Sequence, residues 1–397
     1  MRVEMFYDVV CPYACIGAFA SGAEAAALGI ELVWRPVLLG GLMAAAGTPA
    51  VPAQTWSPAR QAVGRHDLLR EGRRAGLGIR QHPEHPRRTV EAMRLLTAAP
   101  EDVRPALSLA LFRAGNLEGR DVSDRSVWGP LAQAHGVDPD VVNDPAVKDE
   151  LRAATAAASD AGMFGVPTYR VGDRWWWGQD RRHLAWSAAT GRRVESRQVD
   201  GGRRGAVVTV YHDVASPFSY LAQTQLPRLA AAAGAVLDWR PILVGGLFRD
   251  IGTVDVPLVA MGERKRAYQV RDLLDHAAWW DVPFTFPSRF PLRSVTVQRA
   301  LLVAPEARKT LYRAVWAEDA DVGSDEGCTA ILDGAGLPGR DILARTQAPE
   351  VKAALIANTQ AARDAGACGV PTLVIDGEVF WGQDRLAAAF EAMTAAS

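Results

Sequence analysis

Two short segments of the chain, residues 3–7 and 207–211, show an alternation of apolar and polar positions built from β-branched and aromatic side chains. This alternation predicts a β-strand in each place. An Ala-rich segment follows each strand and starts with Pro12 or Pro217. Because proline fits the first position of a helix, the pattern predicts a helix directly after each strand.

The rest of each half follows a common order. A second strand ends in Trp-Arg-Pro, and a long stretch with helical periodicity comes next. Ala-rich helices are predicted at 146–162 and 348–366, and each is followed by Gly-Val-Pro-Thr. Two short strands and a closing helix, starting at Asp180 or Asp384, complete the pattern.

The two halves are copies of one unit. FYDVVCPYACIGA at 6–18 matches YHDVASPFSYLAQ at 211–223, and WRPVLLGGLM at 34–43 matches WRPILVGGLF at 239–248. GVPTYRVGDRWWWGQDR at 165–181 matches GVPTLVIDGEVFWGQDR at 369–385. The offset is 205 residues for the first two pairs and 204 for the third. Matching blocks in the same order indicate a tandem duplication.

A βαβ unit, a helical insertion and a ββα unit predict an α/β protein of two tandem thioredoxin-like domains, each with an inserted helical subdomain. We place the first copy at 1–190 and the second at 206–397. The polar Arg- and Gly-rich stretch 191–205 cannot build a core, and we predict that it is a linker.

Composition narrows the class of protein. The chain has 397 residues, 49% of them hydrophobic and 22% charged, with 44 basic against 45 acidic residues. This balance, and the lack of a basic stripe with interleaved aromatic residues, argue against nucleic-acid binding. No apolar run approaches a membrane span, no signal peptide is evident, and four cysteines are too few for a disulfide scaffold. We therefore expect a cytoplasmic protein that does not bind membranes.

Cys11 and Ser216 hold equivalent places, directly after a strand and directly before the helical proline. That position is a helix N-cap, where unpaired backbone N–H groups and the helix dipole favour negative charge. A thiolate of Cys11 would be stabilised there, which lowers the pKa of the thiol. The Ser216 hydroxyl could instead donate to a thiolate carried by a ligand, or it could simply cap the helix.

The Gly-Val-Pro-Thr segments supply the second candidate feature. In a thioredoxin-like fold the peptide bond before Pro167 and Pro371 is expected to be cis, a deliberate feature where it occurs. The backbone N–H and C=O of Val166 and Val370 would then be unpaired and would face the start of the first helix. An extended thiol peptide could pair with them as an added strand, or the segment could be only a tight turn.

With these features in place, the second copy resembles the 2-hydroxychromene-2-carboxylate isomerase family and the related kappa-class glutathione transferases. The matching blocks are DVASPFSYLA (213–222), WRPILVGGLF (239–248), KRAY (265–268), VPFTFPSRFP (282–291) and GVPTLVIDGEVFWGQDRL (369–386). They extend along essentially all of 207–394. The resemblance implies a glutathione-dependent isomerase or transferase.

The same resemblance implies a set of site residues. Ser216 matches the serine that activates the glutathione thiol, and Lys265 of the Lys-x-x-Tyr pattern matches a residue near the glutathione carboxylate. Val370 with Pro371 matches the backbone contact, and Asp384, followed by Arg385, matches the acid that holds the γ-glutamyl end. Gly252-Thr253 stands where the family usually has Gly-Asn. Losing that asparagine removes one contact to the tripeptide, so the cofactor is glutathione or another low-molecular-weight thiol.

Several aromatic side chains of the second copy could line a pocket for an aromatic small-molecule substrate, or could be ordinary core. They are Phe248, Trp279, Trp280, Trp316 and Trp381. Adding a thiolate to an α,β-unsaturated carbonyl compound and eliminating it again would isomerise a conjugated double bond. We therefore predict a thiol-dependent isomerase or transferase centred on Ser216. We expect no bound metal.

The first copy departs further from this pattern. Its CPYAC motif places Cys15 four residues after Cys11, and the 205-residue offset puts Arg60 and Val63 at the Lys-x-x-Tyr positions. The equivalents of the second-copy site residues are Cys15, Val166, Pro167 and Asp180. Cys11 is a nucleophile or a sensor, or the first copy is a structural partner. The alternative function is a thiol–disulfide oxidoreductase that uses Cys11 and Cys15.

Because family members are typically homodimers, we expect an intrachain pseudo-dimer or a homodimer.

Overall fold

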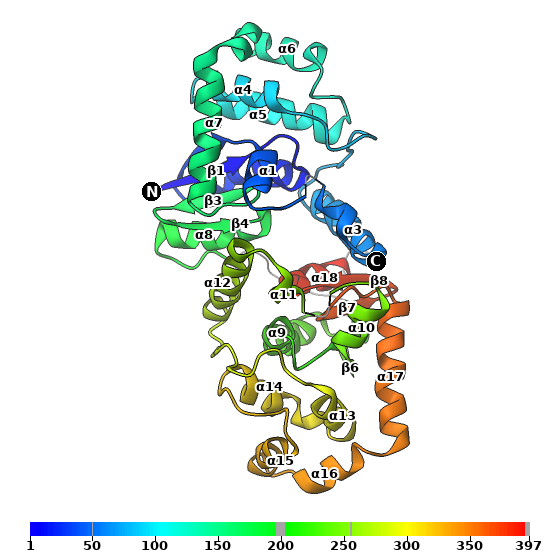
Figure 1. Cartoon of the computed structure of the whole chain (residues 1–397). Helices are drawn as coiled ribbons and strands as arrows, with labels where there is room; N and C mark the ends of the chain where they lie inside the picture. Colours follow the sequence, from blue (N-terminus) through cyan, green and yellow to red (C-terminus); the bar gives the residue numbers. More distant parts are fainter. Residues whose placement is uncertain (50, 196–202, 255, 394–397) are drawn as a thin grey trace. The chain divides into compact units, whose positions relative to one another are not determined.

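The computed structural model describes residues 1–49, 51–195, 203–254 and 256–393 (Figure 1). The chain divides into two compact units. Unit 1 comprises Met1–Thr55, Arg65–Ser196 and Gly262–Lys265, and unit 2 comprises Trp56–Gly64, Arg197–Met261 and Arg266–Ser397. Each unit is therefore built mainly from one copy of the repeat and includes a short segment of the other copy's sequence.

The sheet of unit 1 has four strands in the order β2-β1-β3-β4. These are β1 (Arg2–Tyr7), β2 (Glu31–Pro36), β3 (Thr168–Val171) and β4 (Arg174–Trp177). β1 and β2 are parallel, whereas β1 with β3 and β3 with β4 are antiparallel. The parallel pair β1–β2 belongs to the predicted βαβ unit, and the antiparallel pair β3–β4 belongs to the predicted ββα unit.

Helices of the first copy connect and cover these strands. They are α1 (Pro12–Ala27), α2 (Leu39–Ala45), η1 (Pro52–Thr55), α3 (Pro58–Arg74), α4 (Val90–Ala98), α5 (Arg104–Phe112), η2 (Arg113–Leu117), α6 (Arg125–Ala134), η3 (Pro139–Asn143), α7 (Pro145–Asp160), η4 (Gln179–Arg181) and α8 (Arg182–Thr190). The helical subdomain contains α4 to α6, and α7 runs from it back to the sheet (Figure 1).

Unit 2 repeats this architecture with the strand order β6-β5-β7-β8. Its strands are β5 (Val207–His212), β6 (Val236–Pro241), β7 (Thr372–Ile375) and β8 (Glu378–Trp381). The helices of the second copy are α9 (Pro217–Ala233), α10 (Val244–Asp250), α11 (Pro257–Ala260), α12 (Glu263–Trp279), α13 (Val295–Val303), η5 (Pro305–Ala307), α14 (Arg308–Trp316), α15 (Asp325–Gly334), α16 (Gly339–Arg345), α17 (Pro349–Asp364), η6 (Gln383–Arg385) and α18 (Leu386–Ala392).

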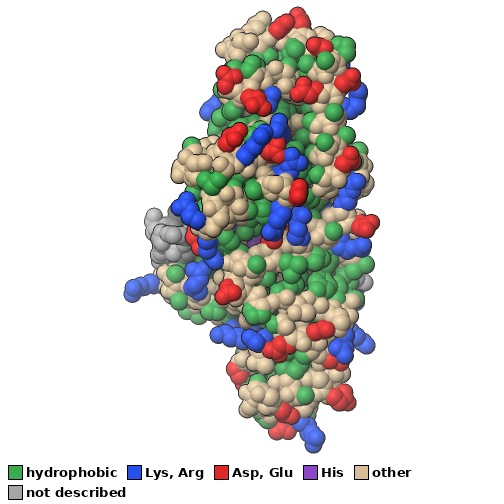
Figure 2. Space-filling view, turned by 90° about the vertical axis from the view of Figure 1, so that its left-hand side faces the viewer, with side chains coloured by type: hydrophobic (Ala, Val, Ile, Leu, Met, Phe, Trp, Pro, Cys, Tyr) green, Lys and Arg blue, Asp and Glu red, His purple; other side chains and the backbone are tan. Residues whose placement is uncertain are grey.

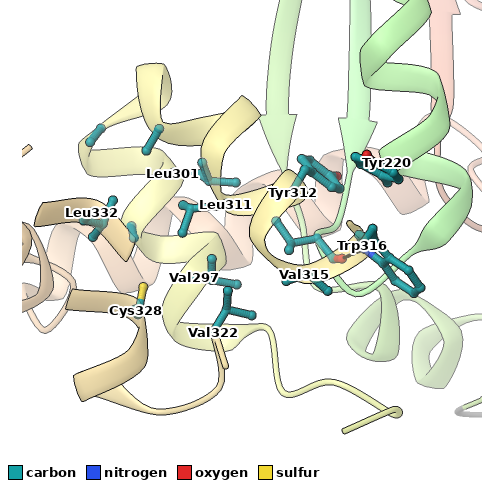
Figure 3. Packing of buried hydrophobic residues seen from close by; sticks show 14 of the residues in the cluster. Tyr220, Val297, Leu301, Leu311, Tyr312, Val315, Trp316, Val322, Cys328 and Leu332 are labelled. Carbon is teal, nitrogen blue, oxygen red and sulfur yellow. Dashed lines mark hydrogen bonds between the residues drawn. The ribbon is translucent and has the colours of Figure 1, made fainter. Parts of the chain in front are cut away.

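The core of unit 2 has three parts. One face of the sheet packs against α9 and α18 through residues such as Val210, Leu226 and Phe390. The other face packs against α10 and α17 through residues such as Tyr211 and Leu247. The helical subdomain has its own cluster around α13 to α15, which reaches α9 at Tyr220 (Figure 3). Because helices cover both faces of the sheet, the ends of its strands are held in defined positions.

The predicted fold is confirmed, with small differences at element boundaries. The long helices predicted at 146–162 and 348–366 are α7 and α17, and each starts at a proline and ends two residues earlier than predicted. A 3₁₀ turn, η4 or η6, precedes each closing helix. The copy boundaries and the linker at 191–205 stay predictions, because 196–202 lie outside the described residues.

Candidate functional site

Ser216 lies at the point where β5 ends and α9 begins. It is the N-cap of α9, with Pro217 at the first helical position, and its Oγ accepts a hydrogen bond from the Ser219 N–H at 3.2 Å. The side chain is 6% exposed. Ser216 therefore caps α9, which is one of the two roles that the sequence left open for it. The cap also fixes the direction of the hydroxyl, because the lone pair that accepts from Ser219 is already committed.

The cis-proline segment faces this hydroxyl. The Val370–Pro371 peptide bond is cis, as predicted. The Ser216 hydroxyl donates to the Val370 carbonyl oxygen at 3.2 Å. The carbonyl therefore faces the start of α9 as expected, but the prediction that it is unpaired is wrong. A buried carbonyl is costly without a donor, and the nearby N-cap hydroxyl supplies one.

Asp213 holds the loop between β5 and α9, and sequence reasoning missed it. Its carboxylate accepts from the backbone N–H of Ala215 and of Val244, both at 2.9 Å, and from the Ser294 side chain. It thus ties the Ser216 loop to the starts of α10 and α13. Complete burial raises the pKa of Asp213 to about 6, which these hydrogen bonds only partly offset. The available signal was the recurrence of this aspartate, as Asp8, in the first copy.

In the first copy, the Cys11 thiol takes the place that the Ser216 hydroxyl has in the second copy. Cys11 is the N-cap of α1, and its thiol lies 3.3 Å from the carbonyl oxygen of Val166, which precedes cis Pro167. Its side chain makes no capping hydrogen bond. Asp8 accepts from the Val10 and Leu39 N–H groups, as Asp213 does in its own loop.

The prediction that the N-cap position lowers the pKa of Cys11 is wrong. Burial raises the pKa of Cys11 to about 12, and the backbone N–H groups of Ala14 and Tyr13 offset only part of that effect. Burial also raises the pKa of Cys15, one helical turn further on, and the neighbouring Cys11 adds to the rise. Both are free thiols. Desolvation of the thiolate outweighs its attraction to the helix terminus here.

The turn after the last strand has the same form in both copies. Asp384 forms an ion pair with Arg385 at 3.4 Å, and Asp180 forms one with Arg181 at 2.8 Å. Gly382 precedes Asp384 with φ +109°. A Cβ at Gly382 would lie 2.7 Å from the Asp384 carboxylate oxygen, so only glycine leaves room for this turn.

These two halves match one sequence family. The DSBA-like thioredoxin domain profile matches residues 2–188 and again 207–393. This chain belongs to that family. Together with the two equivalent sheets, the double match establishes a tandem duplication of a DSBA-like thioredoxin domain.

Proteins of known name align with about half of this chain. A 2-hydroxychromene-2-carboxylate isomerase of Sphingobium xenophagum is 29% identical over 204 residues, which are 45% of this chain and 93% of that protein. Human glutathione S-transferase kappa 1 is 29% identical over 201 residues, which are 45% of this chain and 87% of that protein. A solved structure of a 2-hydroxychromene-2-carboxylate isomerase aligns with a TM-score of 0.44 at 21% identity, over 48% of this chain and 94% of that one.

Of the predicted cofactor residues, Val370 lies at Ser216, where its carbonyl accepts the serine hydroxyl. Thr253 follows α10, and its N–H donates to the Phe248 carbonyl at 2.8 Å. Lys265 belongs to unit 1, where its ammonium group lies 5.7 Å from the centre of the Trp177 ring. Its assignment to the Ser216 site therefore stays a prediction that rests on the resemblance.

The predicted pocket aromatics differ in their exposure. Trp316 is completely buried, and its indole N–H donates to the Val214 carbonyl at 2.8 Å (Figure 3). That hydrogen bond places Trp316 directly beneath the loop that carries Ser216. The other side chains, Phe248, Trp279, Trp280 and Trp381, are half-buried.

Two further observations concern metals and membranes. Within residues 1–49, 51–195, 203–254 and 256–393, no three His, Cys, Asp or Glu side chains lie close enough to share a metal ion. In that same part of the chain, no helix combines the length and the apolar character needed to cross a membrane. Basic and acidic side chains are interspersed on the face shown in Figure 2.

Proposed function

We propose that the second copy is a thiol-dependent isomerase or transferase, with glutathione or a related low-molecular-weight thiol as cofactor. The hydrogen bond from the Ser216 hydroxyl to the carbonyl of cis Val370–Pro371 is the main support. It brings the Ser216 hydroxyl, at the N-terminus of α9, next to the carbonyl of the cis-proline segment, a group that can pair with an extended ligand. The names of the relatives, an isomerase and a kappa-class glutathione transferase, agree with this proposal.

The residues fit a thiol peptide. The Val370 carbonyl can accept a backbone N–H from an extended ligand, as in the addition of a strand. Once the carbonyl has that partner, Ser216 no longer needs to donate to it, and its proton is available to a ligand sulfur. The Ser219 N–H keeps the oxygen in place meanwhile. Pairing of the ligand backbone with the Val370 carbonyl would thus free the Ser216 hydroxyl from that carbonyl.

A bound thiol would supply a soft nucleophile that adds to an electrophilic carbon and leaves it again. The chain's own contribution is electrostatic. The Ser216 hydroxyl and the N-terminus of α9 lower the cost of negative charge at the sulfur position. Asp213 holds these groups in place through its hydrogen bonds to Ala215 and Val244. The substrate class is an aromatic or α,β-unsaturated carbonyl compound.

A thermal-shift titration with glutathione tests this proposal. Ligand at 100 times its dissociation constant adds about 2.7 kcal/mol to the free energy of unfolding, which raises the melting temperature measurably. We expect Asp384→Ala to abolish the shift. Asp180→Ala removes the equivalent carboxylate of the first copy and is expected to leave the shift intact. If neither glutathione nor any other small thiol raises the melting temperature, the proposal is wrong.

The alternative function is a thiol–disulfide oxidoreductase that works through Cys11 and Cys15. The Cys11 thiol at 3.3 Å from the Val166 carbonyl favours it, because the thiol faces the cis-proline segment. The raised pKa values of both thiols weigh against it. Intact mass after alkylation, with and without reduction, distinguishes the two functions. A reversible loss of two hydrogens that maps to Cys11 and Cys15 would support the oxidoreductase.

A further inference from the structure

Gln298 is a fully buried side chain on α13 of the helical subdomain, and it contacts the loop that carries Ser216. Its Oε1 accepts a hydrogen bond from the Val214 N–H at 3.2 Å. Its Nε2 donates to the carbonyl oxygen of His212 at 2.8 Å and to that of Ile242 at 2.7 Å. One amide therefore joins the end of β5, the loop after it, and the residue that follows β6.

Only one orientation of this amide satisfies its three partners. A reversed amide would set Oε1 against the carbonyl oxygens of His212 and Ile242, and Nε2 against the Val214 N–H. All of these groups are buried, where a polar group without a partner is costly. The position of the Gln298 side chain and the position of Val214 are therefore fixed together.

Both backbone groups of Val214 are held by the helical subdomain. Gln298 accepts from its N–H, and the Trp316 indole N–H donates to its carbonyl oxygen at 2.8 Å. The turn that follows is closed by a hydrogen bond from the Ser216 N–H to the Asp213 carbonyl oxygen at 3.0 Å. Because this turn contains Val214, the helical subdomain sets the direction in which the chain reaches Ser216.

The first copy has a different side chain at the equivalent place. Met93, which is 205 residues before Gln298, is fully buried on α4. A methionine has no N–H to donate and cannot join three backbone groups in this way. The carbonyl of Val9, the equivalent of Val214, accepts from the Asn116 side chain at 2.8 Å. An apolar side chain fills the position in one copy, so packing alone does not require the amide in the other.

We propose that Gln298 is a positioning residue for Ser216, which it aligns with the sulfur of the bound thiol. This inference rests on the proposed function. When the thiol loses its proton to solvent, the Ser216 hydroxyl donates to the thiolate that remains, and a hydrogen bond weakens steeply when it is misaligned. A small shift of the loop therefore makes the bound thiol less acidic without removing any group that contacts the ligand. The helical subdomain thus determines how acidic that thiol is.

The acidity of glutathione bound to the full-length chain tests this proposal. The thiolate absorbs ultraviolet light where the thiol does not, so a pH titration of the complex gives the acid dissociation constant of the thiol. The proteins compared are the wild type, Ser216→Ala, Gln298→Met and Asn116→Leu. Gln298→Met introduces the residue of the first copy. Asn116→Leu is the matched control, because it removes the buried amide that contacts the equivalent loop of the first copy.

We expect Gln298→Met to lower the acid dissociation constant of the bound thiol about 10-fold, because a misplaced donor stabilises the thiolate less. Asn116→Leu should leave it unchanged. S-methylglutathione, which has no ionisable thiol, should bind all four proteins equally. The proposal is wrong if Gln298→Met titrates like the wild type while Ser216→Ala does not. It is also wrong if Asn116→Leu has the same effect as Gln298→Met, or if Gln298→Met weakens S-methylglutathione binding as much as it lowers the acid dissociation constant.

Gln298→Glu is the second variant if Gln298→Met does not fold. Glutamic acid has nearly the same shape and keeps an acceptor for the Val214 N–H, but it can donate to at most one of the two carbonyl oxygens. It should also lower the acid dissociation constant of the bound thiol. A wild-type value in Gln298→Glu would overturn the proposal.

Hydrogen exchange of the ligand-free protein separates this failure from that of the proposed function. Because Ser216 Oγ accepts from the Ser219 N–H, exchange at that amide reports the position of the serine side chain. Gln298→Met should speed exchange in peptides that cover 213–220, and Asn116→Leu should not. If it does so while neither Gln298→Met nor Ser216→Ala changes the acidity of the thiol, Gln298 positions Ser216 and the thiol-dependent function is wrong. If exchange is also unchanged, both proposals are wrong.

Discussion

The Ser216 hydroxyl donates to the Val370 carbonyl oxygen at 3.2 Å, and these two residues are 154 positions apart in the chain. The same hydroxyl oxygen caps α9 by accepting from Ser219. One oxygen therefore joins the start of the first helix to the cis-proline segment of the second copy. A ligand N–H that donates to the Val370 carbonyl oxygen would share this acceptor with the Ser216 hydroxyl, because a carbonyl oxygen has two lone pairs.

Removing the Ser216 hydroxyl should affect turnover and stability differently. We expect Ser216→Ala to lower kcat about 100-fold with glutathione and an α,β-unsaturated aryl ketone, because one donor to the developing charge is lost. The lost cap should reduce the free energy of unfolding by about 1 kcal/mol. Steady-state kinetics and chemical denaturation measure the two effects.

Ser324 provides the matched control. It caps α15 by accepting from the Gly327 N–H at 3.1 Å, as Ser216 caps α9, but it belongs to the helical subdomain. Ser324→Ala should cost a similar free energy of unfolding and leave kcat unchanged. Turnover by Ser216→Ala at the wild-type rate would exclude a role for this hydroxyl in activating the thiol.

Much of this site could be predicted from sequence because its signals are local. The N-cap Ser216 is marked by the strand before it and the proline after it, and the cis bond before Pro371 by the repeated Gly-Val-Pro-Thr. Both features are determined by a few consecutive residues. The parallel pairing of β5 with β6 follows from the same local patterns, because the two strands of a βαβ unit that pair with each other are parallel.

What could not be predicted depends on residues far apart in the chain. The rise in the pKa of Cys11 comes from burial by tertiary packing, which opposes the local effect of the N-cap. Two of the donors to Asp213, the Val244 N–H and the Ser294 side chain, come from the starts of α10 and α13, which no local pattern connects to it. The place of Arg60 in unit 2 likewise follows from packing and not from its position in the repeat.

Cys11 should react slowly with alkylating agents. With its pKa raised to about 12 by burial, the thiolate fraction at pH 7.5 is about 3000-fold below that of a free cysteine with a pKa near 8.5. The rate of carbamidomethylation at Cys11, followed by peptide mass spectrometry, should rise about tenfold per pH unit between pH 8 and 10. Rapid modification at pH 7.5 would instead show an activated thiol and favour the oxidoreductase alternative.

Asp213 should make the free energy of unfolding depend on pH in the weakly acidic range. Its pKa is raised to about 6 in the folded state, against about 4 in an unfolded chain, so the folded state binds the proton more tightly. This group's contribution is therefore most favourable below about pH 4 and is lost as the pH rises through 6. Relative to Asp213→Asn, the wild type should lose on the order of 1 kcal/mol or more between pH 4.5 and 7.5.

Chemical denaturation of the two proteins at several pH values measures that difference. The comparison with asparagine removes the titration of every other group, because these are common to both proteins. A stability difference that stays constant across this range would show that Asp213 is ionised in the folded state at pH 4.5. In that case its hydrogen bonds to Ala215 and Val244 outweigh its burial.

A methyl group at Gly369 should disturb the second-copy site specifically. The new Cβ would lie 2.6 Å from the Trp381 indole nitrogen and 3.1 Å from an adjacent ring carbon, so the cis-proline segment or the indole must move. A shift of either changes the position of the Val370 carbonyl relative to Ser216. We expect Gly369→Ala to weaken glutathione binding at least about 10-fold in a thermal-shift or calorimetric titration, since misplaced hydrogen-bonding groups lose 1 kcal/mol or more.

Gly165→Ala is the internal control, because the structure imposes the same clash in the first copy. Its Cβ would also lie 2.6 Å from an indole nitrogen, that of Trp177. The two variants should therefore lose similar free energies of unfolding, whereas only Gly369→Ala should lose glutathione affinity. Equal losses of affinity in both variants would indicate that both copies bind the thiol. Loss in Gly165→Ala alone would move the binding site to the copy that carries Cys11.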